Sequence, residues 1–313
     1  MGGGTWTTQA YDFSTKTKID TGTTFAYTSY AKSRRIDEAH EDLRILMEGK
    51  PVTRESRDSD EHPESTPIVI AFDVTGSMGG NPAILQRELK GLFGMLIRKD
   101  VVSDPQIAIG AYGDTHCDRV PIQFSQFESD NRIDDNLDNV YLEMGGGGNM
   151  GETSTALAWY VANYVVTDAW EKRGKRGYVF LIGDECALDI TESQAKEFLG
   201  EDHGVTAFDA FNALLKKWDT YFLLVNNYAS KMQHSQQKYT DMLGSDHVIV
   251  LESTESAPAV IAALIGLAEE TVDANALSTE LAESGFSTDV AVSAANATVG
   301  LAGVDSSYGD LGL

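Results

Sequence analysis

The sequence contains little cysteine, few basic residues and no long apolar run, and each shortage excludes a class of protein. Cys117 and Cys186 are the only two cysteines among 313 residues, so a disulfide framework is excluded. The chain also does not start with a charged segment followed by an apolar one, which argues against a secreted protein. We therefore expect a reducing compartment.

Basic residues are outnumbered by acidic ones. The chain has 24 Lys and Arg against 48 Asp and Glu, a formal net charge of −24. This charge repels the phosphate backbone, and no basic stripe is present, so we expect no nucleic-acid partner. No apolar stretch approaches the roughly 20 residues of a membrane span, so we expect no membrane association. Zinc motifs and the Gly-Lys-Ser/Thr ending of a phosphate-binding loop are also missing.

Apolar runs and helical patterns alternate along the middle of the chain. The run PIVIAFDV (67–74) is rich in Ile and Val, which is typical of a strand buried on both faces. This alternation predicts an α/β fold in which helices flank a doubly wound, mostly parallel sheet. The further predicted strands are 106–112, 119–124, 178–185, 220–227 and 247–253, and the main predicted helices are 84–100, 154–170 and 257–272.

Two extensions flank the predicted domain of residues 66–272. Residues 1–65 are expected to be an N-terminal arm with a short helix over 36–47 and a charged connection over 54–66. Residues 273–313 have a low apolar content, which predicts a tail that is disordered or ordered only by a partner. Aromatic residues of the arm either contact a partner or pack on the domain, and these are Trp6, Tyr11, Phe13, Phe25, Tyr27 and Tyr30.

Acidic residues follow three of the predicted strands. Asp73, Asp114 and Asp184 should meet, because the carboxyl ends of parallel strands share one edge, where open α/β sheets bind ligands. Thr75 and Ser77 add two hydroxyls beside Asp73, and a helix cap would account for only one of these oxygens. Facing carboxylates repel one another, whereas a hard divalent cation takes carboxylate and hydroxyl oxygens. The sequence therefore predicts a metal site.

The run DVTGSM (73–78) resembles the metal-ion-dependent adhesion site of von Willebrand factor A domains, whose pattern is Asp-x-Ser/Thr-x-Ser. The resemblance covers residues 66–272 and implies a bound Mg²⁺ or Mn²⁺. It implies that Thr75 and Ser77 bind the ion directly, and that Asp73 binds it directly or through water. It also implies that Asp184, in LIGDE, is the water-mediated acidic residue of a later loop.

The glycine-rich loop departs from the common A-domain pattern. GGGG is followed by Asn149, Met150, Gly151 and Glu152, which is similar to integrin β subunits and hemicentin-type A domains. That similarity implies that Glu152 reaches the metal, with Thr153 as the alternative ligand. It also implies a Ca²⁺ at an adjacent second site. The residues of that site would be Asp114, Asn149, Gly151 and Glu152, unless Asp114 and Asn149 only shape their loops.

The family resemblance implies binding rather than catalysis. In such a site one coordination position stays open for an acidic side chain of a protein partner. The alternatives are a structural component of a larger assembly, with the arms making the contacts, and a metal-dependent phosphohydrolase. The segment 54–78, with FESD, GGGGNMGE and LIGDE, looks similar to A-domain proteins of bacteria and their phages. It implies a bacterial cytoplasm or a phage particle, and a possible homo-oligomer or larger assembly.

Overall fold

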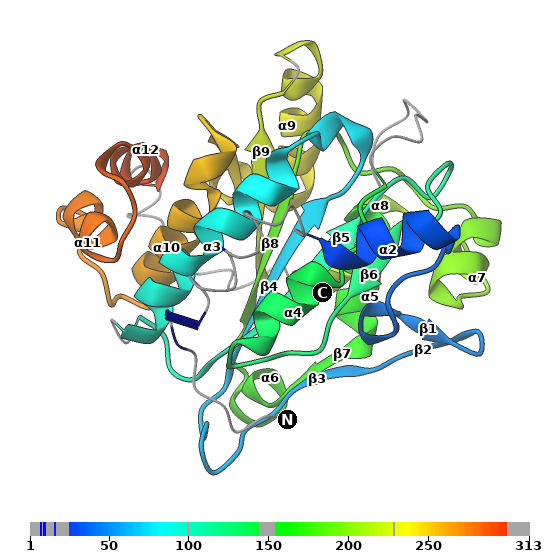
Figure 1. The fold of residues 1–313 in the computed structure, drawn as a ribbon, viewed down its shortest axis with the longest axis horizontal. Coiled ribbons are helices and arrows are strands. Elements are labelled where there is room, and N and C mark those ends of the chain that lie inside the picture. The colour runs from blue at the N-terminus through cyan, green and yellow to red at the C-terminus, as the bar shows by residue number, and fades with distance from the viewer. Residues whose placement is uncertain are drawn as a thin grey trace, which may run out of the picture.

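A six-stranded sheet forms the centre of the protein (Figure 1), in the order β10-β9-β8-β4-β5-β6. This computed structural model describes residues 25–98, 101–143, 154–227 and 229–298, with positions 7, 9, 10 and 16. The strands from β10 to β5 run parallel, and β6 pairs antiparallel with β5 at one edge. The predicted fold class is confirmed. The strands are β4 (Thr66–Asp73), β5 (Pro105–Tyr112), β6 (Ile122–Phe124), β8 (Gly177–Gly183), β9 (Trp218–Val225) and β10 (Val248–Leu251).

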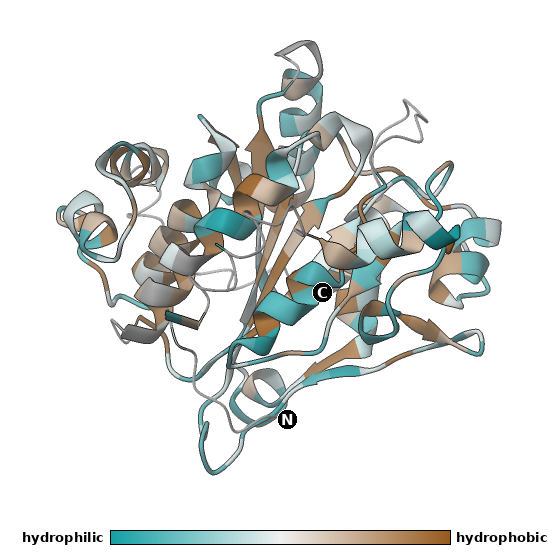
Figure 2. Ribbon diagram, viewed as in Figure 1, coloured by the Kyte–Doolittle hydropathy of each residue, from teal (hydrophilic) through white to brown (hydrophobic). Residues whose placement is uncertain are grey.

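Strand β4 lies inside the sheet because it can bury both of its faces. Ile68, Ile70 and Phe72 belong to the core cluster on one face, and Val69 and Ala71 belong to the cluster on the other. Figure 2 shows the central strands as hydrophobic and the flanking helices as more mixed. Helices α3 (Asn81–Arg98) and α10 (Ala257–Ala268) cover the first face, and α5 (Ser154–Tyr164), α8 (Ala207–Leu214) and α9 (Ala229–Leu243) cover the second.

A second, two-stranded sheet corrects two of our predictions. Strand β3 (Arg54–Ser56) pairs in parallel with β7 (Val165–Thr167). The charged connection predicted over 54–66 therefore begins as a strand. The long helix predicted over 154–170 is divided into α5 and α6 (Asp168–Arg173), because three consecutive β-branched residues at 165–167 favour a strand once β3 is available to pair with them.

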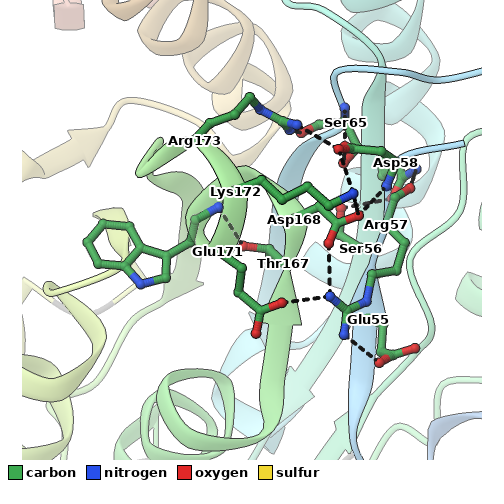
Figure 3. A network of polar contacts seen from close by, with 12 residues as sticks. Glu55, Ser56, Arg57, Asp58, Ser65, Thr167, Asp168, Glu171, Lys172 and Arg173 are labelled. Carbon is green, nitrogen blue, oxygen red and sulfur yellow. Dashed lines mark hydrogen bonds and ion pairs between the residues drawn. The ribbon is translucent and has the colours of Figure 1, made fainter.

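Charged side chains attach the segment after β3 to helix α6 (Figure 3). Arg57 Nη1 donates to Asp168 Oδ1 at 2.9 Å and to Glu171 Oε2 at 2.7 Å. Asp58 Oδ2 accepts from Arg173 Nη1 at 2.7 Å, and Asp58 Oδ1 accepts from the Ser65 hydroxyl at 2.7 Å. The connection is therefore held on the domain by charge-assisted hydrogen bonds, which are among the stronger ones in proteins.

Asp58 should stabilise the fold only while it is ionised. Burial opposes its ionisation, but hydrogen bonds from Arg173, Ser65 and Lys172 outweigh burial and lower the pKa of Asp58 below its usual 3.8. A lowered folded pKa contributes stability above the unfolded pKa, and this stability is lost as the pH falls. We expect Asp58→Asn to cost about 2 kcal/mol near neutral pH, and progressively less below about pH 4.

Urea unfolding of wild type and Asp58→Asn, near neutral pH and near pH 2, checks this prediction. Asp60→Asn, a change to a neighbouring exposed carboxylate, is the control and should be nearly neutral at both. An equal cost of Asp58→Asn at the two pH values would contradict the electrostatic origin of the effect.

The described aromatic residues of the N-terminal arm differ in how far they are buried. Phe25, just before α2 (Ala26–Arg34), is 2% exposed, and its ring lies 6.4 Å from that of Phe72. Tyr30 is 47% exposed. Packing on the domain is therefore the correct alternative for Phe25. The predictions for Trp6, Tyr11 and Phe13 lie outside the described residues.

The prediction of a tail that is disordered or ordered only by a partner is wrong for residues 277–283 and 288–298, which are helical in the chain alone. Helices α11 (Leu277–Glu283) and α12 (Thr288–Thr298) pack on the domain. Leu277 and Leu281 of α11, and Phe286 between the two helices, belong to the same core cluster as α3 and α10. An added Cβ at Gly91 would lie 2.5 Å from the Phe286 ring, so the glycine allows this ring to approach α3 closely. These helices contain few large apolar residues and bury small alanines instead, among them Ala291 and Ala294. Residues 299–313 lie outside the described part.

The remaining elements are short. The helix predicted over 36–47 is wrong, because residues 41–43 form one 3₁₀ turn and 46–51 form a hairpin. No helix in the described ranges is both long and apolar enough to cross a membrane. The remaining short elements are η1 (Glu41–Leu43), β1 (Leu46–Met47), β2 (Lys50–Pro51), α4 (Arg132–Asp138), α7 (Glu192–Leu199), η3 (Ser245–His247) and η4 (Thr254–Ser256).

Candidate metal centre

Asp73 ends the central strand β4 and is fully buried. Its Oδ1 accepts the backbone N–H of Thr75 at 2.6 Å. Its Oδ2 is also buried, and no described group donates a hydrogen bond to it. Burial outweighs the hydrogen bonds from Thr75 and, with the nearby charge of Asp184, raises the pKa of Asp73 well above its usual range. The Asp73 carboxylate is therefore held where it is poorly solvated.

A tight turn after Asp73 brings the two hydroxyls together. The Val74 N–H donates to the Tyr112 carbonyl at 2.9 Å, which continues the β4–β5 pairing beyond Asp73. The chain then turns through η2 (Gly76–Met78), and Thr75 Oγ1 lies 3.0 Å from Ser77 Oγ. Gly79 leaves this turn at a φ of 51°, a left-handed conformation that glycine adopts without steric cost.

Asp184 follows the neighbouring strand β8 and contacts the turn. Ser77 Oγ donates to Asp184 Oδ1 at 2.9 Å. The structure therefore brings Asp73, Thr75, Ser77 and Asp184 into one connected set, as expected for polar residues after adjacent parallel strands. The predicted residues Asn149, Gly151 and Glu152, and the alternative ligand Thr153, lie outside the described residues.

Asn227 belongs to the same cluster, and our reading of the sequence missed it. It follows strand β9, and its Nδ2 donates to Asp184 Oδ2 at 3.0 Å and to the Ser77 carbonyl at 3.2 Å. The predicted ligand set takes an acidic residue from each of three strand ends and none from the end of this strand. The available signal was the polar pair that ends the predicted strand 220–227, because that strand ends at the same edge as the others.

Asp114 is buried in the loop after β5, where its described contacts lie within its own loop. Asp114 Oδ1 accepts the His116 N–H at 2.8 Å and lies 2.9 Å from His116 Nδ1. The Asp114 N–H donates to Asp118 Oδ2 at 2.7 Å, and burial raises the pKa of Asp118 to about 6. None of the described contacts joins Asp114 to Asp73 or Asp184, and the second cation site stays a prediction.

The cluster fits a hard divalent cation in its chemistry. It offers two carboxylates and two hydroxyls, the oxygen donors that Mg²⁺ and Mn²⁺ take. The buried, unpartnered Asp73 Oδ2 is an oxygen that a cation would satisfy. The described ranges hold no group of three or more His, Cys, Asp or Glu that could bind a metal. Glu152, the further carboxylate predicted for this site, lies outside those ranges.

The strand order, and the position of the cluster at the carboxyl ends of the parallel strands, agree with the resemblance carried by DVTGSM. The fold is the doubly wound, mostly parallel α/β arrangement that this resemblance implies. No protein-family profile matches the chain, and no curated protein matches it.

Several solved structures are similar in fold. The pilus adhesin SpaC from Lactobacillus rhamnosus GG has 8% identity and a TM-score of 0.49, over 70% of this chain and 31% of SpaC. The chain thus spans about a third of that adhesin. The vWF domain of the type V pili tip protein Mfa5 from Porphyromonas gingivalis has 11% identity and a TM-score of 0.42, over 70% and 95% of the two chains. BatB from Bacteroides thetaiotaomicron has 12% identity and a TM-score of 0.40, over 66% and 100%.

Proposed function

We propose that this chain is a protein-interaction module that captures a carboxylate of a partner protein through Mg²⁺ or Mn²⁺. Asp73, Thr75, Ser77 and Asp184 would hold the ion, with Glu152 as a further ligand. The observation that carries the proposal is the buried Asp73 Oδ2, to which no described group donates. A buried carboxylate oxygen without a partner is costly, and a bound cation removes that cost.

The remaining coordination positions support binding of a partner. Mg²⁺ requires a nearly octahedral set of about six ligands and keeps several waters in protein sites. The side chains that we assign would fill only part of this set. A carboxylate from another protein could then replace a water and be held by the charge of the ion. The partner's acidic side chain is thus recognised by charge and by coordination geometry.

The alternative role, a structural part of an assembly held by its arms, has little support from the described parts of the two extensions. Phe25, α11 and α12 pack into the domain core rather than extending from it. From the sequence resemblance we propose a bacterial cytoplasm or a phage particle as the setting.

Calorimetric titration with Mg²⁺ and Mn²⁺ tests the metal centre. We expect wild type to bind one ion at the edge of the sheet, and we expect Ser77→Ala to bind it at least about tenfold more weakly, because a direct ligand and its hydrogen bond to Asp184 are lost. Ser33→Ala, which changes an exposed serine in α2, is the matched control. Equal affinity in wild type and Ser77→Ala would exclude the proposed ligand set.

Affinity capture from the native source tests the partner. Wild type in Mg²⁺ should retain a protein that is released by chelator and is not retained by Ser77→Ala. Retention that depends on neither the metal nor Ser77 would exclude a metal-bridged interaction.

A further inference from the structure

We infer that Asn227 sets the cation selectivity of this centre, favouring Mg²⁺ over Ca²⁺ by keeping Oδ2 of Asp184 hydrogen-bonded and so opposing chelation through both oxygens. The inference rests on the proposed metal centre and names a residue that controls which ion the centre accepts.

Both oxygens of Asp184 already have donors. Ser77 Oγ donates to Oδ1 at 2.9 Å, and Asn227 Nδ2 donates to Oδ2 at 3.0 Å. These hydrogen bonds take one lone pair of each oxygen and restrict rotation of the carboxylate, so they oppose chelation of one ion by both oxygens. Ca²⁺ takes 6–8 oxygens and commonly uses a carboxylate in bidentate fashion, whereas Mg²⁺ is bound by single oxygens and retains waters. The arrangement around Asp184 therefore disfavours the ligand geometry that Ca²⁺ uses.

Neighbouring contacts fix the direction of the Asn227 amide. Its Nδ2 also donates to the Ser77 carbonyl at 3.2 Å, and its Oδ1 accepts from Asn81 Nδ2 at 3.3 Å. Asn81 Oδ1 in turn accepts from the Thr254 hydroxyl at 3.0 Å. Donors and acceptors alternate consistently from Thr254 to Asp184. The amide nitrogen of Asn227, rather than its oxygen, is thereby directed at the carboxylate.

Asn227 is well suited to this role because it is neutral. Its N–H binds the carboxylate of Asp184 without adding a positive charge that would repel the ion. Groups that orient a ligand in this way typically change metal affinity by about 10- to 100-fold when they are removed. Since the effect acts through the geometry of Asp184, it should differ between ions that need different geometries.

The test compares Asn227→Ala with wild type in direct titrations of Mg²⁺ and Ca²⁺. We expect the Mg²⁺ affinity to fall about 10-fold or more, while the Ca²⁺ affinity stays the same or rises. Water-proton relaxation by bound Mn²⁺ gives an independent readout, because a released Asp184 should displace ion-bound water and lower the relaxation enhancement. Asn226→Ala, the same change one residue earlier on the same exposed segment, should alter neither measurement.

The outcomes separate the two hypotheses. Absence of metal binding by wild type would exclude the proposed function itself. If wild type binds, an unchanged ratio of Mg²⁺ to Ca²⁺ affinity in Asn227→Ala, or an equal loss of both, would overturn the role of Asn227 and leave the metal centre in place. Should Asn227→Ala not fold, Asn81→Ala removes the contact that orients the amide, and it should shift the ratio in the same direction by a smaller factor.

Discussion

Replacing Asp73 by Asn should stabilise the metal-free protein and abolish its stabilisation by Mg²⁺. In wild type, burial raises the folded pKa of Asp73 above the unfolded value of 3.8. A raised folded pKa means that stability is greatest below the unfolded pKa and is lost as the pH rises through the folded pKa. Asparagine keeps the shape of the side chain and does not ionise. Its advantage in chelator should therefore grow as the pH rises.

Mg²⁺ should reverse the order of stability. An ion that binds only the folded state stabilises wild type by about 2.7 kcal/mol at a concentration 100 times its Kd. Asp73→Asn lacks the carboxylate at the centre and should gain almost nothing. Thermal unfolding from about pH 4 to pH 8, in chelator and in Mg²⁺, measures both effects. Asp60→Asn is the control for a lost surface charge. If Asp73→Asn is the less stable protein in chelator throughout this range, Asp73 is not a strained metal ligand.

Ending the chain at residue 272 should prevent cooperative folding. The truncation removes α11, α12 and the connection between them, whose buried Leu277, Leu281 and Phe286 complete the core beside α3 and α10. Loss of a large buried side chain costs about 2–5 kcal/mol, and whole domains are stable by only about 5–15 kcal/mol. The truncated chain should therefore lose most or all of its stability. Circular dichroism and urea unfolding measure this.

Point substitutions give a graded version of the same prediction. Leu281→Ala, at a fully buried position, should cost about 2–5 kcal/mol. Val292→Ala, at a position that is 45% exposed on α12, should change stability by about 0.5 kcal/mol or less. Similar small effects at both positions would show that the C-terminal helices do not support the core.

The central strands could be predicted from the sequence because their signal is local. The run 67–74 contains the residues of β4 almost in full, since a strand buried on both faces must be apolar along its length. Residues 165–167 are different. Their strand depends on a partner more than a hundred residues away, and in isolation they extend the helical pattern of α5. The tail was misread because Ala291 and Ala294 bury little apolar area each, although both are fully buried.

The candidate site was predictable where it follows the rule that parallel strands end at one edge. That rule brought Asp73 and Asp184 together with the hydroxyl of Ser77. Asn227 obeys the same rule, but it belongs to no motif and is not an acidic residue, so the sequence does not single it out as a site residue. The contacts of Asn227 with Asp184 and Ser77 depend on the direction of its side chain, which the sequence pattern does not contain.

The pairing of β3 with β7 has a consequence for the order in which the chain folds during synthesis. Arg57 and its partner Asp168 are 111 residues apart, so β3 leaves the ribosome long before its pairing strand exists. Contacts between distant parts of a chain also slow folding, because a large loop must close first. The segment that contains β3 should therefore dock late. Until β7 is available, the charged residues of this segment, among them Arg57 and Asp58, help to prevent the unpaired β3 from pairing with other chains.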